Sequence, residues 1–269
     1  MTETVSRHAA STASGEAADR PPRRPLFIGE LLIVFVLVFA YDRIRDLATS
    51  HPRESLANAR DLLRWERWAH IDIELPFNAW LSGHHSLADL ASWYYQLAHL
   101  TVTLLVLLAC YGLRPDAYRP ARNALLAINA IGLAVFWVYP VAPPRLLPSG
   151  GFVDTAVVTG AASASAASNP YAAMPSLHIA WAVWTALVAL LVVRGRYPRV
   201  IWAAYPMLTT VVVIATANHY VLDVVAGFAV ALVAVVVPAV GPSLLQVIRS
   251  REGPPVEDDA QQREPELAA

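Results

Sequence analysis

The residues of this sequence best suited to chemistry are a histidine and an aspartate four positions apart, His219 and Asp223. On a helix this spacing places both side chains on one face, where the carboxylate can hold an imidazole N–H and fix the tautomer of the ring. A second histidine, His178, follows a proline and a serine at the start of another apolar segment. Two histidines in unlike environments can divide a phosphoryl transfer: His219 attacks phosphorus, while His178 protonates the leaving alcohol and later deprotonates the acceptor.

A phosphate held beside these histidines needs cationic or hydrogen-bond-donating side chains, and two residues near the histidines are candidates. Arg145 follows a run of prolines that ends an apolar segment, and Ser176 stands at the expected start of a helix, with Pro175 expected at the first helical position. The helices that begin near Ser176 and Asn218 would add backbone N–H groups and the positive ends of their dipoles. Asn218 and Tyr220, on either side of the histidine of the pair, are secondary candidates for the site.

His99 is an ionisable residue inside an apolar segment, which makes it a functional candidate, although a hydrogen bond between helices is an equal alternative. Its neighbours Trp93, Tyr94 and Tyr95 are typical of an aromatic belt at a membrane interface. The two histidines and the carboxylate could instead bind a metal ion, as in non-haem iron sites. That alternative ranks second, because an arginine and two helix N-termini favour an anion over a cation. We therefore expect no metal and no other cofactor.

The composition indicates the environment in which these residues work. Of 269 residues, 56% are hydrophobic and only 15% are charged, whereas soluble domains carry about 25% charged residues. The sequence contains no lysine, which excludes Schiff-base catalysis and a Walker A lysine, and its net charge of −1 argues against nucleic-acid binding. A single cysteine, Cys110, cannot build a disulfide framework or a cysteine-based zinc site. An integral membrane protein remains.

Six apolar segments, each near the roughly 20 residues that cross a bilayer, must position the polar residues. They lie near 26–41, 90–111, 122–141, 175–193, 199–217 and 219–240. The first also resembles a signal peptide, but no clear cleavage site follows it, so a retained span is the better interpretation. We therefore expect an all-α integral membrane protein with a bundle of six transmembrane helices over residues 26–248. The polar ends, 1–25 and 249–269, predict disordered tails.

Two connecting segments have a composition of their own. Residues 42–89 mix charges with an apolar pattern that includes Leu56, Leu63 and Trp68, which predicts a helix lying in the membrane interface between the first and second spans. A small extramembrane cap packed on the bundle is an equal alternative. Residues 150–169 are rich in Gly, Ala and Ser, which predicts a mobile loop that could act as a lid over the site.

Arginines set the expected orientation, because short cytoplasmic loops collect positive charge. They cluster in 114–122, between the second and third spans, in 194–199, between the fourth and fifth, and in 249–251 after the sixth. Both termini, and hence both tails, are therefore predicted to be cytoplasmic in the cell membrane. The segments that carry the histidine pair and Arg145 then meet at the outer face, where we expect the active site.

At three motifs the sequence resembles the type 2 phosphatidic acid phosphatase superfamily of membrane lipid phosphatases and phosphotransferases. These motifs read APPR at 142–145, AMPSLH at 173–178 and NHYVLD at 218–223, followed by Ala226-Gly227. The match is closest to the branch that contains fungal inositol phosphorylceramide synthase, and it covers roughly residues 26–240. The resemblance implies a six-span helical fold, His219 as the nucleophile, Asp223 as its partner and His178 as the acid and base, without a metal.

Departures from the phosphatases of this superfamily favour transfer over hydrolysis. The sequence lacks their lysine, reads Val212-Val213 where they have Ser-Arg, and has Leu177 where they have glycine. We expect a metal-independent phosphotransferase that acts on a lipid phosphate or phospho-headgroup, with phosphoinositol as one candidate, through a phosphohistidine. A lipid phosphate or diphosphate phosphatase is the alternative, and a non-catalytic transporter or membrane scaffold is a further one. The expected partners are the bilayer, a membrane lipid substrate and an alcohol or water acceptor, with no nucleic acid.

Overall fold

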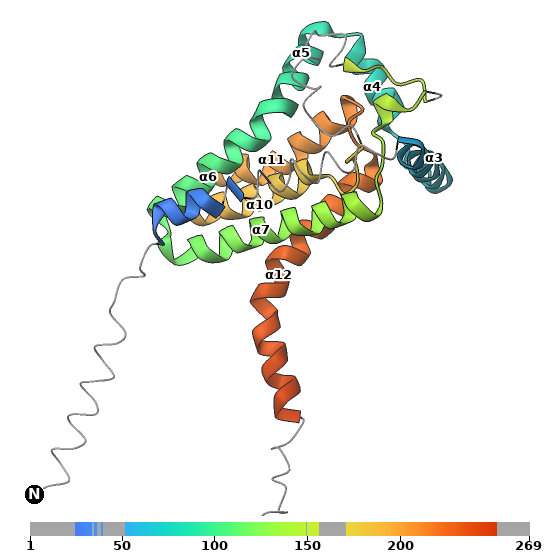
Figure 1. Cartoon of the computed structure of the whole chain (residues 1–269). Helices are drawn as coiled ribbons and strands as arrows, with labels where there is room; N and C mark the ends of the chain where they lie inside the picture. Colours follow the sequence, from blue (N-terminus) through green and yellow to red (C-terminus); the bar gives the residue numbers. More distant parts are fainter. Residues whose placement is uncertain are drawn as a thin grey trace, which may run out of the picture.

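The computed structural model describes residues 25–33, 35–36, 39, 52–148, 150–155 and 171–251, with side chains as far as 238. Every regular element in this part of the chain is a helix, and one isolated parallel bridge pairs Val141 with Ala172. In chain order the elements are α3 (Pro52–Ala69), α4 (Glu74–Ser82), α5 (His85–Trp93), the π-helix η1 (Tyr94–Ala98), α6 (His99–Leu113), α7 (Pro115–Val138), the 3-10 turn η2 (Pro144–Leu146), α10 (Leu177–Val192), α11 (Arg196–Ala215) and α12 (Val221–Arg251) (Figure 1). The predicted all-helical fold class is thus confirmed for the described residues.

Four helical stretches are long and apolar enough to cross a membrane. They are His85–Leu113, Pro115–Val138, Arg196–Ala215 and Val221–Pro238, and they correspond to the predicted spans at 90–111, 122–141, 199–217 and 219–240. The predicted span at 175–193 forms α10, which is apolar but shorter. These helices indicate a membrane protein.

The remaining predictions of organisation fall largely outside the described residues. The first span, at 26–41, is helical at 27–33 and then only partly described, so the count of six spans stays a prediction. The tails at 1–24 and 252–269 and the loop at 156–170 are not described. Helix α12 continues to Arg251, into the first residues of the predicted C-terminal tail, and the disorder of that tail stays a prediction.

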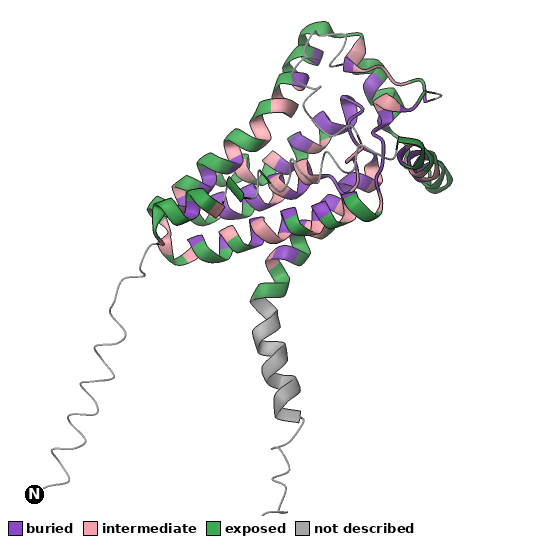
Figure 2. Ribbon diagram, viewed as in Figure 1, coloured by how far each residue is buried: buried purple, intermediate pink, exposed green. Residues whose placement is uncertain are grey.

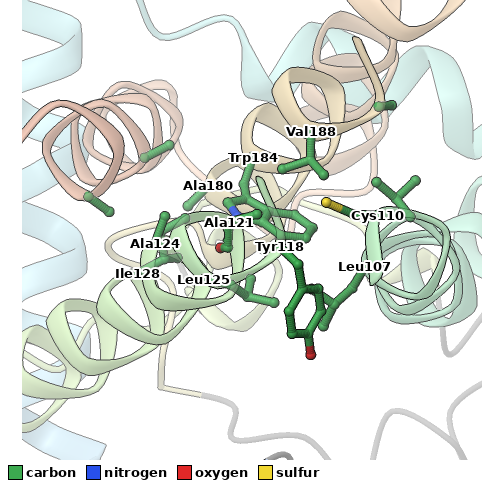
Figure 3. Close-up of a cluster of buried hydrophobic side chains, with 14 residues drawn as sticks. Leu107, Cys110, Tyr118, Ala121, Ala124, Leu125, Ile128, Ala180, Trp184 and Val188 are labelled. Atoms are coloured by element: carbon green, nitrogen blue, oxygen red, sulfur yellow. The ribbon is translucent and has the colours of Figure 1, made fainter. Parts of the chain in front are cut away.

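Helix α10 lies at the centre of the bundle, where it packs against α6, α7, α11 and α12 (Figure 1). Its Trp184 is buried and donates a hydrogen bond from Nε1 to the carbonyl oxygen of Ala121 on α7 at 2.8 Å. Small residues such as Ala180 and Ala124 let the helices approach, and Ile128 fills the space beside them (Figure 3). This core fixes the depth at which α10 presents its first turn.

The helices of the bundle carry many exposed residues on their outward faces (Figure 2), and a large number of these residues are apolar. Leu105 and Leu108 on α6, Val138 on α7 and Leu232 on α12 are more than half exposed. A soluble protein seldom exposes so much contiguous apolar surface, whereas a lipid environment requires it. The exposed faces therefore agree with helices that lie in a bilayer.

Helices α3 and α4 cover the end of the bundle at which α10 and α12 begin (Figure 1). Asn78 of α4 donates hydrogen bonds to the carbonyl oxygens of Val153 and Ala215 at 3.0 and 3.1 Å. The helix predicted within 42–89 is therefore present as α3, and its Trp68 points outward. Its location in a membrane interface stays a prediction.

Candidate active site

The predicted pair of His219 and Asp223 meets at the start of α12. Nδ1 of His219 lies 3.5 Å from Oδ2 of Asp223, and both side chains are buried. One expectation is wrong in detail, because α12 begins at Val221 and His219 precedes the helix. The carboxylate of Asp223, at the third helical position, accepts the backbone N–H of Tyr220 at 2.9 Å. This cap bends the chain so that His219 turns back onto Asp223.

A hydrogen bond to the backbone of Ala173 defines the tautomer of His219. Nδ1 lies 2.9 Å from the carbonyl oxygen of Ala173, and a carbonyl oxygen accepts but never donates, so Nδ1 carries the hydrogen. Ala173 is held there because its segment pairs with Val141, whose carbonyl oxygen accepts the N–H of Ala173 at 3.1 Å. In the neutral form of the ring Nε2 of His219 then carries a lone pair, and this buried atom has no hydrogen-bond partner among the described residues. An unprotonated, unpartnered ring nitrogen is what a nucleophile requires.

His178, in the first turn of α10, lies next to the ring of His219. The ring centroids of His178 and His219 are 5.6 Å apart, so one phosphoryl group can reach both rings. Nε2 of His178 is also buried and without a partner in the described part of the chain. The structure thus brings together the two histidines that the sequence places 41 residues apart (219 minus 178).

His99 also belongs to this cluster. Its ring lies 4.2 Å from that of His178 and 5.6 Å from that of Trp181, and its Nδ1 donates to the carbonyl oxygen of Tyr95 at 2.9 Å. The π-helix η1, directly before His99, shifts the register of the side chains, and such segments are frequent at functional sites. It turns Tyr95 inward, where its ring stacks on His178 at 4.1 Å.

Tyr95 was not expected in the site. The sequence predicts it in an aromatic belt with Trp93 at the membrane interface, and Trp93 is exposed. The sequence contains one signal for the inward position, since Tyr95 is four residues before His99 and so lies on the same helical face. The local π-helical geometry that completes the contact has no comparable signature.

Arg145 contacts Asn218, the residue that directly precedes His219. Its Nε donates to Oδ1 of Asn218 at 2.8 Å, and its backbone N–H donates to the carbonyl oxygen of Ala217 at 3.0 Å. Nη1 lies 3.9 Å from Oδ2 of Asp154. These contacts hold Arg145 against Asn218, the residue that directly precedes the candidate nucleophile, and the role of Arg145 as a phosphate ligand stays a prediction.

Ser176 caps α10. Its hydroxyl accepts the N–H of Ile179 at 3.4 Å, and its own N–H donates to the carbonyl oxygen of Asp223 at 3.0 Å. The helix therefore begins at Leu177, and the expectation of Pro175 at the first helical position is wrong, because a serine is the preferred N-cap. Contact of Ser176 with a phosphate stays a prediction.

The N-terminus of α12 is not open to an anion, contrary to the expectation from sequence. Besides the cap by Asp223, the N–H of Val221 donates to Oε1 of Glu74 and the N–H of Leu222 donates to Oε1 of Glu66, both at 2.7 Å. These carboxylates come from α4 and α3, and both side chains are fully buried. Protein carboxylates thus occupy the positive end of the helix dipole where a phosphate was expected.

Burial raises the pKa of both carboxyls, and the neighbouring Glu74 helps to raise the pKa of Glu66 to about 9. Sequence reasoning missed these residues. One signal was present for Glu66: on the amphipathic helix α3 it continues the buried face formed by Ala59, Leu62 and Leu63. A carboxylate in the apolar stripe of a helix needs a buried partner, and here that partner is the start of α12.

Metal coordination was the alternative role for the two histidines and the carboxylate. Among the described residues no group of three or more His, Cys, Asp or Glu side chains is arranged to hold a metal ion. Nδ1 of His219 is engaged by Ala173, and Oδ2 of Asp223 accepts the N–H of Tyr220. Three other possible ligand atoms, Nε2 of His178, Nε2 of His219 and Oδ1 of Asp223, have no hydrogen-bond partner in the described part of the chain, so the expectation of a site without a metal stays a prediction.

Comparison with known proteins found one match. The sequence model described as the PAP2 superfamily matches residues 60–237. No curated protein and no solved structure matches the chain. The matched range contains every residue of the site described above, from Glu66 on α3 to Asp223 on α12.

Proposed function

Because the chain belongs to the PAP2 superfamily, whose members are phosphatases and phosphotransferases, we propose that it is a membrane-embedded phosphotransferase. Its substrate is a lipid phosphate or phospho-headgroup, and the reaction is metal-independent and passes through a phosphohistidine on His219. The observation that carries this proposal is the pair of buried, unpartnered Nε2 atoms on His178 and His219, in rings 5.6 Å apart.

The reaction needs two steps with opposite proton transfers. First, Nε2 of His219 attacks phosphorus, the bond to the leaving oxygen breaks, and His178 in its Nε2-protonated form gives that oxygen a proton. The ring of His219 gains positive charge, which Asp223 and the carbonyl oxygen of Ala173 stabilise at Nδ1. Then the acceptor hydroxyl gives its proton to Nε2 of His178, its oxygen attacks phosphorus, and the bond to His219 breaks.

The charge beside the nucleophile favours a phosphodiester donor. The guanidinium held next to His219 is that of Arg145, it already faces Asp154, and the chain contains no lysine. A phosphodiester carries one negative charge, whereas a phosphomonoester carries about 1.5 to 2 at neutral pH. One arginine matches the diester better, which supports transfer of a phospho-headgroup over hydrolysis of a lipid phosphate.

Labelled substrates test the proposal directly. Purified protein is incubated with head-group-labelled phosphatidylinositol, other phosphodiester lipids and lipid phosphates, with and without alcohol acceptors. We expect label on the acceptor and on a histidine trapped by alkaline quench, and loss of both in His219→Ala. His85→Ala, which alters an exposed histidine, is the matched control and should behave as wild type. Free phosphate as the sole product would replace the transferase with a phosphatase, and turnover by His219→Ala would refute the assignment.

We further propose that the site faces the outside of the cell membrane, with both termini cytoplasmic. Arg114, between α6 and α7, donates from Nη1 to the carbonyl oxygen of Leu191 near the end of α10 at 2.8 Å. The arginine-bearing connections therefore share one end of the bundle, while His178 stands at the other end of α10. Positive charge favours the cytoplasm. Cysteines introduced at Ser86 and at Arg196 should differ in labelling by an impermeant thiol reagent on intact cells, with only the first labelled.

A further inference from the structure

Carboxyl side chains cap several backbone N–H groups at the start of α12. Three consecutive backbone N–H groups, those of Tyr220, Val221 and Leu222, donate to Asp223, Glu74 and Glu66 at 2.9, 2.7 and 2.7 Å. The first N–H groups of a helix have no partner within the helix and are commonly capped by one side chain. Here three side chains from three different helices converge on one terminus, which is the terminus that carries the candidate nucleophile.

The two glutamates are close enough to interact with each other. Each uses Oε1 for the helix terminus, and neither Oε2 finds a donor among the described residues. Their carboxyl groups act directly on one another. Both are fully buried, where two adjacent charges are costly. A single proton held between the two Oε2 atoms supplies the donor that both lack and removes one of the charges.

We propose that Glu66 and Glu74 form a proton-sharing clamp that fixes the N-terminus of α12 and so positions Asp223 and His219. Its hydrogen bonds are observed in the structure, whereas its effect on turnover rests on the proposed function. In this role the glutamates are positioning residues, because their contacts reach the reacting atoms only through the backbone of α12.

Titratable groups around the clamp make it sensitive to pH. Glu66 faces Glu74 on α4 and Asp223 on α12, and the hydroxyl of Tyr220 is buried near all three carboxyls. Glu66, whose pKa of about 9 is far above its ordinary value of 4.5, binds its proton more tightly in the folded protein. The stability that this proton supplies is complete below the ordinary pKa and is lost as the pH rises through about 9.

Glutamine at position 66 mimics the protonated carboxyl. Its amide oxygen can still accept the N–H of Leu222, and its amide nitrogen can donate to Glu74, so Glu66→Gln should keep the clamp closed at every pH. Glu66→Ala removes it. Glu54→Gln alters an exposed glutamate in the first turn of the same helix and is the matched control.

Thermal unfolding of the purified full chain in detergent, followed from pH 6 to about pH 10, tests the shared proton without any substrate. We expect the midpoint of wild type and Glu54→Gln to fall toward alkaline pH more steeply than that of Glu66→Gln, so that Glu66→Gln is the more stable protein above about pH 9. Parallel curves for wild type and Glu66→Gln would show that no proton is held and would overturn the clamp.

Phosphoryl transfer over the same pH range tests positioning. We expect Glu66→Ala to lower kcat by at least about tenfold through misplacement of His219, with KM little changed. Glu66→Gln should retain wild-type kcat at neutral pH and lose the alkaline decline. Wild-type kcat in Glu66→Ala would overturn the positioning role. If wild type transfers no phosphoryl group at all, the proposed function fails, and the unfolding curves still decide whether the clamp exists.

Discussion

Replacing Gly227 with alanine should misalign the two helix ends that carry the site. A β-carbon at this position of α12 would lie 2.4 Å from the carbonyl oxygen of Ser176 and 3.0 Å from Cβ of Ile179. The oxygen belongs to the backbone, so no side-chain rotation relieves the contact. Restoring a separation of 3.0 to 3.4 Å requires α12 and α10 to move apart by about 0.6 to 1 Å at their crossing.

That displacement acts on the groups proposed to do the chemistry. The hydrogen bond from the N–H of Ser176 to the carbonyl oxygen of Asp223 is 3.0 Å long and spans the same crossing. Separation of the helices would lengthen it and draw His219 away from His178. A misplacement of about 1 Å in a reacting group costs on the order of 10²-fold in rate. The overpacking itself should destabilise the fold by about 1 to 3 kcal/mol, partly offset by a gain of about 1 kcal/mol in helix propensity.

Two other glycines turn this substitution into a graded series. An added β-carbon at Gly112 meets nothing within 4 Å, whereas at Gly132 it meets the flexible side chain of Leu177 at 2.5 Å. Thermal midpoint and transfer rate should therefore fall in the order Gly112→Ala, Gly132→Ala, Gly227→Ala, with the first at or above wild type. If Gly227→Ala unfolds at the wild-type temperature and transfers phosphate at the wild-type rate, the close contact of α10 and α12 does not exist as described.

Three further substitutions test the proposed phosphate ligand Arg145, the histidine His99 that packs against His178, and the buried core around Trp184. Arg145→Ala should lower kcat/KM by about 10²-fold, as removal of one charge-stabilising donor does, and a wild-type value in the labelled-lipid assay would exclude it as a phosphate ligand. His99→Phe keeps a ring against His178 but removes the bond to the carbonyl oxygen of Tyr95; a lowered kcat at an unchanged thermal midpoint would assign it to catalysis, whereas the reverse would assign it to packing. Trp184→Phe should lower stability by about 1 to 3 kcal/mol, because the core loses the indole hydrogen bond to the carbonyl oxygen of Ala121 and part of the volume of the larger ring; an unchanged midpoint in thermal unfolding would contradict that.

Short-range patterns in the sequence predicted much of the site. The spacing of His219 and Asp223 and the position of Arg145 after its prolines depend on local chain geometry, and the structure places His219 beside Asp223 and Arg145 against the adjacent Asn218. Most predicted spans also correspond to helices, since about 20 apolar residues leave the chain few alternatives in a membrane. Sequence patterns therefore predicted those features that depend on a single segment of the chain.

Partners that come from distant segments could not be predicted. Glu66 and Glu74 meet α12 across more than 140 residues of sequence, and no periodicity identifies which helix terminus a buried carboxylate will cap. The inward turn of Tyr95 depends on a π-helical segment, which no residue type marks. The first residues of α10 and α12, Leu177 and Val221, differ from expectation for a similar reason. Caps supplied by Ser176 and by distant carboxylates determine where these helices begin.

The arrangement of charge suggests why the second helix terminus is closed to the substrate. If both termini were open, a phosphate could settle on α12 itself, away from the line of attack by Nε2 of His219. The two glutamates and Asp223 occupy that terminus, and in the proposed mechanism the carboxylate of Asp223, 3.5 Å from Nδ1 of His219, stabilises the positive ring that forms on attack. Arg145 supplies positive charge at the adjacent Asn218. In the same proposed mechanism the arginine attracts the anionic group, and the phosphorus of that group then meets the unpartnered Nε2 of His219.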